Sequence, residues 1–139
     1  VDRHNRSIHR PGSDRLLKAL QGNIDRNLMS INERRGSEMP GANIVVEELE
    51  FGDQAAAEFI EAEHGPFDII IGSDITYLSM VRPLLMSTLQ QLCGASAHVL
   101  LAHMGRNTRD LLSSLHAAGL AATVVHRRAD VSIIECTRM

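Results

Sequence analysis

Residues 66–78 read Pro-Phe-Asp-Ile-Ile-Ile-Gly-Ser-Asp-Ile-Thr-Tyr-Leu, and this stretch decides the fold class of the chain. The three isoleucines at 69–71 are β-branched and do not alternate with polar residues, which is typical of a strand buried on both faces of a parallel sheet. In such sheets ligands bind just beyond the carboxyl ends of the strands. Ser73, Asp74 and Tyr77 follow the strand at that end, so the stretch predicts a ligand site.

The composition limits the classes of function. A chain of 139 residues suffices for one domain, and a net charge of -3 argues against nucleic acid and an anionic membrane surface as partners. No apolar run approaches the length of a membrane span. Cys93 and Cys136 lie far apart in the sequence and fit neither a metal site nor a disulfide framework. This cysteine usage favours a cytoplasmic or nuclear location.

Periodicity, caps and turn residues predict the other elements. The first half is predicted to contain a helix capped by Ser13-Asp14 and running to about Leu28, a loop over Ser30 to Ala42, a strand over Asn43 to Leu49 and a helix over Gln54 to Glu63 capped by Asp53. The second half begins with the strand over Phe67 to Gly72 and continues with a helix from roughly Ser79 to Cys93, a strand over Ala97 to Ala102, a helix over Thr108 to Ala118 capped by Asn107, and strands over Ala121 to His126 and Val131 to Thr137.

Helices and strands alternate along most of the chain, which predicts an α/β fold with a largely parallel sheet. The last two strands are joined only by Arg127 to Asp130, which is too short for a helical crossover. We therefore expect an antiparallel hairpin at the end of the chain.

Several stretches then resemble one family in their order and spacing. They are Asn23-Ile24-Asp25-Arg26-Asn27 (an N-I-x-x-N pattern), Glu48-Leu49-Glu50-Phe51-Gly52 (E-L-x-W-G) and Phe67 to Tyr77 (F-D-x-I-L-G-A-D-x-x-Y). The chain is similar to the carboxyl-terminal two thirds of a seven-β-strand, class I S-adenosylmethionine-dependent methyltransferase. Within that superfamily it most resembles the protein-lysine methyltransferases of the methyltransferase-like 21 group.

The resemblance implies a Rossmann-like sheet with helices on both faces, and it implies roles for several residues. Asp74 and Tyr77 match the D-x-x-Y motif at the junction of cofactor and substrate lysine, so they are the candidate catalytic residues. Phe51 stands where relatives carry the tryptophan that borders the adenine, and Ser73 replaces an alanine beside the cofactor. The implied cofactor is S-adenosylmethionine, and the implied partner is a protein with a target lysine, such as a chaperone or a translation factor.

The chain departs from the family at its amino-terminal end. No G-x-G-x-G turn occurs in it, and the acid that binds the ribose hydroxyls is either Asp2 or Asp14. The first residue is Val1, and strand-like residues appear only near Ile44. We therefore expect that the central first strand is missing, that the strand at Ile69 has an unpaired apolar edge, and that the chain is a fragment, inactive alone.

Plainer interpretations exist for the same residues. Asp74 and Tyr77 can serve as a helix cap and a packing ring, and Phe51 as a core aromatic. The seven histidines lack ligand spacing, which predicts no metal site; His103, at the carboxyl end of a strand, is interpreted as structural. The alternative functions are a degenerate methyltransferase fold that acts as a non-catalytic binding module, a small-molecule methyltransferase and, less in keeping with the closing hairpin, a nicotinamide-dependent reductase.

Overall fold

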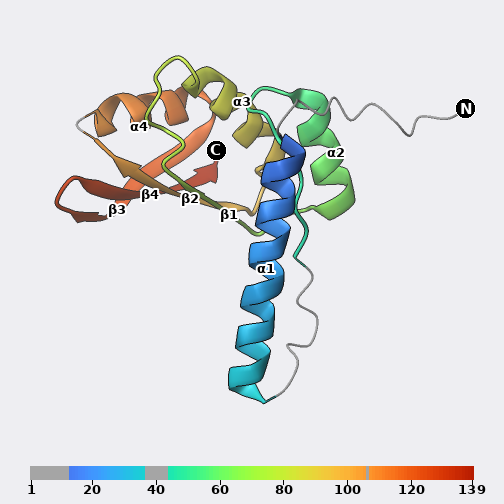
Figure 1. The fold of residues 1–139 in the computed structure, drawn as a ribbon. Helices are drawn as coiled ribbons and strands as arrows, with labels where there is room; N and C mark the ends of the chain where they lie inside the picture. Colours follow the sequence, from blue (N-terminus) through green and yellow to red (C-terminus); the bar gives the residue numbers. More distant parts are fainter. Residues whose placement is uncertain (1–12, 37–43, 106) are drawn as a thin grey trace, which may run out of the picture. The chain divides into compact units, whose positions relative to one another are not determined.

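The computed structural model describes residues 13–36, 44–105 and 107–139 (Figure 1). The chain divides into two compact units, Val1–Glu48 and Leu49–Met139. The sites predicted from the sequence at Ser73, Asp74 and Tyr77 belong to the second unit, and Asp2 lies outside the described residues.

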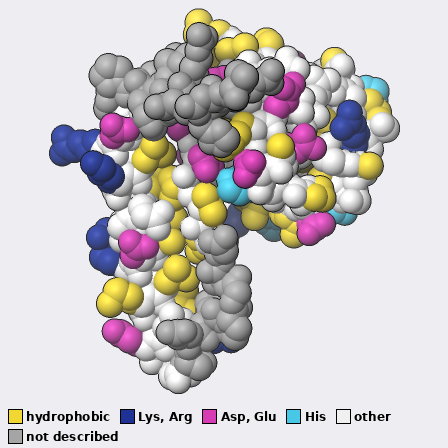
Figure 2. Space-filling view, turned by 90° about the vertical axis from the view of Figure 1, so that its right-hand side faces the viewer, with side chains coloured by type: hydrophobic (Ala, Val, Ile, Leu, Met, Phe, Trp, Pro, Cys, Tyr) yellow, Lys and Arg dark blue, Asp and Glu magenta, His cyan; other side chains and the backbone are white. Residues whose placement is uncertain are grey.

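The first unit contains the helix α1, Ser13–Arg35. It is longer than predicted, because the expected loop from Ser30 is helical as far as Arg35 and the helix ends at Gly36, whose φ is 67°. Residues 30–35 contain no glycine or proline, so nothing in them interrupts the backbone hydrogen bonds. No residue of α1 is fully buried, and Figure 2 shows hydrophobic side chains at its surface in the lower part of the view.

The strand predicted over Asn43 to Leu49 is wrong where the structure describes it. Residues 44–50 have no regular secondary structure, and Ile44 and Val45 are about half exposed. β-branched residues favour a strand only when a neighbouring strand accepts their backbone hydrogen bonds. None of the four described strands forms a ladder with this segment, so its local preference for a strand is not realised.

The second unit is built on a four-stranded mixed sheet. Its strands are β1 (Ile69–Ser73), β2 (His98–Met104), β3 (Leu120–Arg128) and β4 (Val131–Arg138), in the spatial order β1-β2-β4-β3. β1 and β2 are parallel, whereas β4 is antiparallel to both of its neighbours. The α/β class and the closing hairpin are confirmed, but the expectation of a largely parallel sheet is not met in the part of the chain that the structure describes.

Three helices accompany the sheet, namely α2 (Gln54–His64), α3 (Arg82–Leu92) and α4 (Thr108–Ala117). The predicted cap of α2 is confirmed, since Asp53 Oδ1 accepts a hydrogen bond of 3.0 Å from the backbone N–H of Ala56. Pro83 lies in the first turn of α3, where its missing N–H costs no helical hydrogen bond. α4 begins directly after Asn107, whose side chain makes no capping hydrogen bond.

The two faces of the sheet differ in burial. On the first face, every second side chain of the strands packs with α3 and α4 in one apolar core. Its buried members include Leu85, Leu89, Val99, Leu101, Leu111, Leu115, Ile134 and Cys136. On the second face Ile69 and Ile71 are 60% and 76% exposed. The prediction that residues 69–71 are buried on both faces is therefore wrong.

The position of β1 explains that exposure. Within the described residues β1 pairs only with β2, so its other edge is unpaired and apolar, as expected from the sequence. Both α3 and α4 pack on the first face. We name the second side, which carries Ile69 and Ile71, the open face of the sheet.

Candidate functional site

Asp74 is the first residue after β1, at the carboxyl end of the strand. Its side chain is exposed and its φ is 56°, a left-handed conformation that non-glycine residues rarely adopt. The backbone N–H of Asp74 donates to the carbonyl oxygen of Ala102 on β2, with an N···O distance of 3.4 Å. Strained backbone of this kind is concentrated at functional sites, which supports the sequence-based choice of Asp74.

The next residue, Ile75, folds back over the strand and packs against the core. A Cβ atom on Gly72 would lie 2.5 Å from Ile75 Cδ1 and 3.0 Å from Leu101 Cδ2. Only glycine leaves that space free. The following loop turns back over β1 and places Ile75 against Gly72, which explains why this position is a glycine.

Thr76 is also turned inward and is only 1% exposed. Its Oγ1 atom lies 2.8 Å from Nδ1 of His103, the sixth residue of β2. The carbonyl oxygen of Thr76 accepts a hydrogen bond of 3.2 Å from Nε of Arg82, the first residue of α3. Both the side chain and the backbone of Thr76 are thus attached to neighbouring elements.

Tyr77 closes the motif and points outward, since 67% of it is exposed. The D-x-x-Y stretch therefore has two inner residues, Ile75 and Thr76, and two outer residues, Asp74 and Tyr77. The inner pair fixes the loop to the core and to β2, and the outer pair is presented at the surface. This arrangement offers a carboxylate and an aromatic ring to a ligand at the carboxyl edge of the sheet.

His103 is buried beneath this loop, with 3% of its surface exposed. Its burial, and secondarily the positive charge of Arg82, lowers the pKa of the imidazole below the ordinary value for histidine. Both effects favour the neutral form of the ring. Its second nitrogen, Nε2, is buried without a hydrogen-bond partner among the described residues.

Phe51 and Gly52 are attached to the same helix as the loop. The backbone N–H of Gly52 donates to Thr88 Oγ1 at 2.9 Å, and a Cβ atom on Gly52 would lie 2.7 Å from Leu84 Cδ2. Phe51 is half-buried and packs against the core. Arg82 and Thr88 are six residues apart, roughly 9 Å along the helix axis. α3 thus fixes the spacing between the Phe51 stretch and the D-x-x-Y loop.

The structure brings only some of the predicted site residues together. Ser73, Asp74 and Tyr77 lie at one end of β1, and Phe51 adjoins the helix that holds their loop. Asp14 is in the first turn of α1, in the other unit, and neither it nor Asp2 can be related to this edge. The roles given to these residues stay predictions.

Sequence reasoning missed the contacts made by Thr76, Arg82 and His103. One signal was available for the burial of His103, because Val99, Leu101 and His103 alternate along β2 and so share a face. Nothing in the sequence indicated that Thr76 would be its partner, since the two residues are 27 positions apart.

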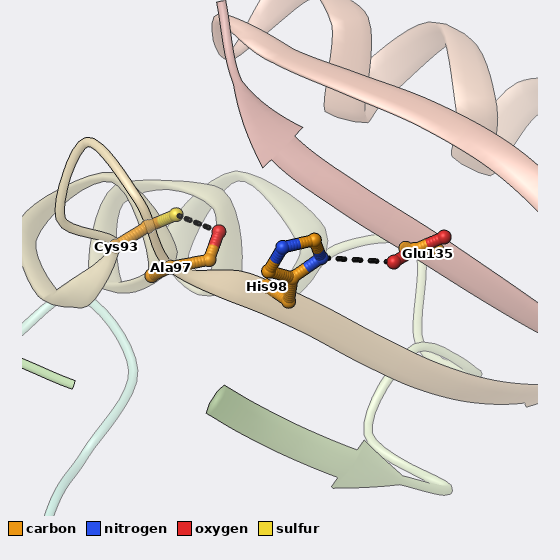
Figure 3. Close-up of polar contacts among 4 residues, drawn as sticks. All are labelled: Cys93, Ala97, His98 and Glu135. Carbon is orange, nitrogen blue, oxygen red and sulfur yellow. Dashed lines mark hydrogen bonds and ion pairs between the residues drawn. The ribbon is translucent and has the colours of Figure 1, made fainter. Parts of the chain in front are cut away.

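A second histidine of β2 has the opposite surroundings. His98 lies on the open face and is exposed, and its Nδ1 atom is 2.9 Å from Glu135 Oε1 on β4 (Figure 3). Beside it the buried Cys93 thiol lies 3.9 Å from the carbonyl oxygen of Ala97 (Figure 3). Cys93 and Cys136 are both free, and burial raises the pKa of the Cys136 thiol to about 11 with further contributions from Cys93 and Glu135. Both thiols are buried in the core, and their raised pKa values disfavour the reactive thiolate form.

Other kinds of site were sought in the described part of the chain. A cavity of about 520 Å³ is lined by residues after β2, at the start of α4 and at the β3–β4 turn, including Arg109 and Arg127, but not by Asp74 or Tyr77. Residues 13–36, 44–105 and 107–139 contain no group of three or more acidic, histidine or cysteine side chains able to hold a metal ion. No helix in these ranges has the length and apolar composition that crossing a membrane requires.

The mixed sheet with its accompanying helices is consistent with a Rossmann-like methyltransferase fold. Residues 13–113, well over half of the chain, match the lysine methyltransferase family. The chain therefore belongs to that family, which confirms the resemblance found in the sequence. The match spans α1 to most of α4 and includes both β1 and β2.

Proposed function

We propose that this chain acts in the transfer of a methyl group from S-adenosylmethionine to a lysine side chain of a protein substrate. The family membership supports methyl transfer as the chemistry. The observation that carries the proposal is the D-x-x-Y loop, which exposes Asp74 and Tyr77 while its inner residues are anchored in the core. The proposed substrate is a cytosolic or nuclear protein, of the chaperone or translation-factor class.

The chemistry gives each outer residue a task. A lysine must lose its proton before its nitrogen can attack a methyl group, and the nitrogen becomes positively charged as the new bond forms. The carboxylate of Asp74 would accept a hydrogen bond from the amine and orient it. The ring of Tyr77 would lie against the amine and stabilise the developing cation through its negative face.

The described residues fit the cofactor only in part. Ser73 is an exposed residue at the end of β1, and Phe51 is a half-buried aromatic residue beside the core. The glycine-rich turn that would receive the rest of the cofactor does not occur in the sequence. We therefore derive no catalytic step through the cofactor from this chain.

We further propose that the chain is one part of a catalytic domain and is inactive by itself. Among the described residues the outer edge of β1 is unpaired and apolar, which supports this proposal because exposed edges of that kind recruit another strand. The absence of the glycine-rich turn also favours a second candidate, a non-catalytic binding module built on a methyltransferase fold. A small-molecule methyltransferase differs from the main proposal only in the acceptor.

The experiment is a methyl-transfer assay with isotopically labelled S-adenosylmethionine and a protein extract, read out as labelled methyl-lysine by mass spectrometry. The full product of the gene and the 139-residue chain are assayed side by side. We expect labelled lysine with the full product and none with the chain alone. Absence of labelled lysine in both would overturn the proposed activity and favour the binding module.

Matched variants show whether the predicted residues act. Asp74→Asn and Tyr77→Leu should abolish the labelling, whereas Tyr77→Phe should retain part of it because the ring remains. Asp68→Asn is the control, since it removes an exposed carboxylate at the other end of β1, roughly 20 Å away. Equal activity of Asp74→Asn and Asp68→Asn would exclude Asp74 from catalysis.

A further inference from the structure

The hydrogen bond between Thr76 and His103 joins the D-x-x-Y loop to the carboxyl end of β2. We propose that His103 and Thr76 are positioning residues that hold this loop so that Asp74 and Tyr77 face the acceptor amine. The inference rests on the function proposed above and adds two residues to it. Neither of them touches the acceptor, because both side chains are buried.

The loop needs such an anchor because its outer residues have little to hold them. Asp74 and Tyr77 are exposed, so packing does not restrict their positions. Apart from the 3.4 Å hydrogen bond from the Asp74 N–H to the carbonyl oxygen of Ala102, their positions are set by the two residues between them, and Thr76 carries two of those attachments. One is the 2.8 Å contact with His103, and the other is the 3.2 Å bond from Arg82 to its carbonyl oxygen.

The two attachments restrict different motions. The bond from Arg82 fixes the backbone at Thr76 relative to α3, and the side-chain bond fixes the same residue relative to β2. A residue held from both sides cannot rotate about the chain direction. Without the side-chain bond the loop would keep its course, but the backbone at Asp74, which is strained at φ 56°, would be free to relax.

The surroundings of His103 indicate that stability is not the main reason for a histidine there. Val99 and Leu101, on the same face of β2, are apolar and fully buried. His103 instead places a polar ring in this layer, and its Nε2 atom is buried without a partner among the described residues. An unsatisfied buried group costs stability, so an apolar side chain would suit the core better. The hydrogen bond between His103 Nδ1 and Thr76 Oγ1 therefore explains why this buried position carries a histidine.

Two pairs of substitutions separate the hydrogen bond from the volume of the side chain. His103→Asn keeps a polar atom near the position of Nδ1, whereas His103→Gln carries its amide further out, near the position of Nε2. Thr76→Ser keeps the hydroxyl, whereas Thr76→Val keeps the shape and loses it. The double variant Thr76→Val/His103→Leu removes both partners together, which leaves no unsatisfied group and preserves the fold.

Tyr77 supplies a readout that does not depend on activity. The chain has one tyrosine and no tryptophan, so its intrinsic emission comes from Tyr77 alone. The anisotropy decay of this emission reports the local motion of the ring, and hydrogen exchange at the Asp74 amide reports its bond to Ala102. Both are measured in the same protein as the urea-unfolding midpoint.

We expect faster local motion of Tyr77 and faster exchange at Asp74 in His103→Gln, Thr76→Val and the double variant. His103→Asn and Thr76→Ser should behave as the unmodified chain. In the full gene product the first three should lower kcat, by up to about 10²-fold, with KM for S-adenosylmethionine unchanged. The urea-unfolding midpoint of the double variant should not fall. Changes in Tyr77 motion and Asp74 exchange in this variant therefore cannot result from a loss of stability.

The matched control uses the other histidine of β2. His98→Asn and His98→Gln change the same side-chain atoms on the open face, next to Glu135, and should leave both Tyr77 motion and Asp74 exchange unchanged. Unchanged readouts in His103→Gln, Thr76→Val and the double variant would overturn the positioning role. If no protein is methylated at all, the proposed function fails, while the Tyr77 and Asp74 measurements still decide whether this anchor exists.

Discussion

The two ends of β2 carry histidines in opposite environments. His98 lies on the open face, exposed and 2.9 Å from Glu135, whereas His103 lies on the face covered by α3 and α4 and is 3% exposed. The residues are five positions apart, an odd number, so the pleat of the strand sends them to opposite sides of the sheet. Near one end of β2 a histidine thus contacts a carboxylate at the surface, and near the other end a histidine is buried and hydrogen-bonded to Thr76.

The largest expected effect concerns the two faces themselves. Leu101→Ala, on the covered face, should lower the free energy of unfolding by about 2–5 kcal/mol, because it leaves a cavity in a closed core. Ile71→Ala, on the open face, should change it by about 0.5 kcal/mol or less, since Ile71 is 76% exposed. Urea unfolding followed by circular dichroism measures both. Similar losses would mean that the open face is covered in solution.

The second prediction concerns the buried hydrogen bond between Thr76 and His103. His103→Gln and Thr76→Val should each cost about 1–3 kcal/mol, because each leaves its partner buried without a hydrogen bond. In the double variant Thr76→Val/His103→Leu the loss should largely disappear. A double-mutant cycle built on urea-unfolding data for Thr76→Val, His103→Leu and the double variant gives the coupling energy, and strictly additive losses would contradict a direct bond between the two side chains.

The third prediction concerns pH. Burial, and then the charge of Arg82 on α3, lowers the pKa of His103 in the folded chain, so the unfolded chain binds this proton more tightly. Stability is therefore complete above about pH 6.5 and declines as the pH falls below it, by at most about 1.4 kcal/mol per pH unit for one proton. Unfolding midpoints between pH 8 and pH 5 test this.

His103→Asn is the reference for that series, because it keeps the hydrogen-bonding position and does not titrate. The difference in slope between the two proteins isolates the histidine from the carboxylates that also titrate in acid. Equal slopes would show that His103 is not buried as a neutral ring.

The smallest effect is expected at the exposed pair. His98→Gln carries its amide beyond the Nδ1 position and so removes the contact with Glu135, whose side chain is 38% exposed while that of His98 is 56% exposed. Exposed pairs of this kind contribute less than about 1 kcal/mol. The same urea measurement should therefore place this variant close to the unmodified chain. A loss as large as that of His103→Gln would remove the contrast between the two ends of β2.

Part of the site was predictable because its signals are local. The position of Asp74 and Tyr77 beyond a strand follows from the apolar run before them, and the cap formed by Asp53 follows from its place ahead of a helical pattern. The partner of Thr76 was not predictable, since it depends on the register that sets β1 against β2. The same register decides which side chains of β2 enter the core.

The sequence by itself determined the order of most elements, the closing hairpin, the D-x-x-Y loop and the family to which the chain belongs. These features depend on periodicity, turn residues and motifs that act within a few positions. Only the tertiary structure decided that one face of β1 is exposed and that residues 44–50 form no strand. It also decided that His103 holds Thr76. The reason is that strand pairing and burial are set by neighbours far apart in the chain, and no local preference encodes which neighbour is present.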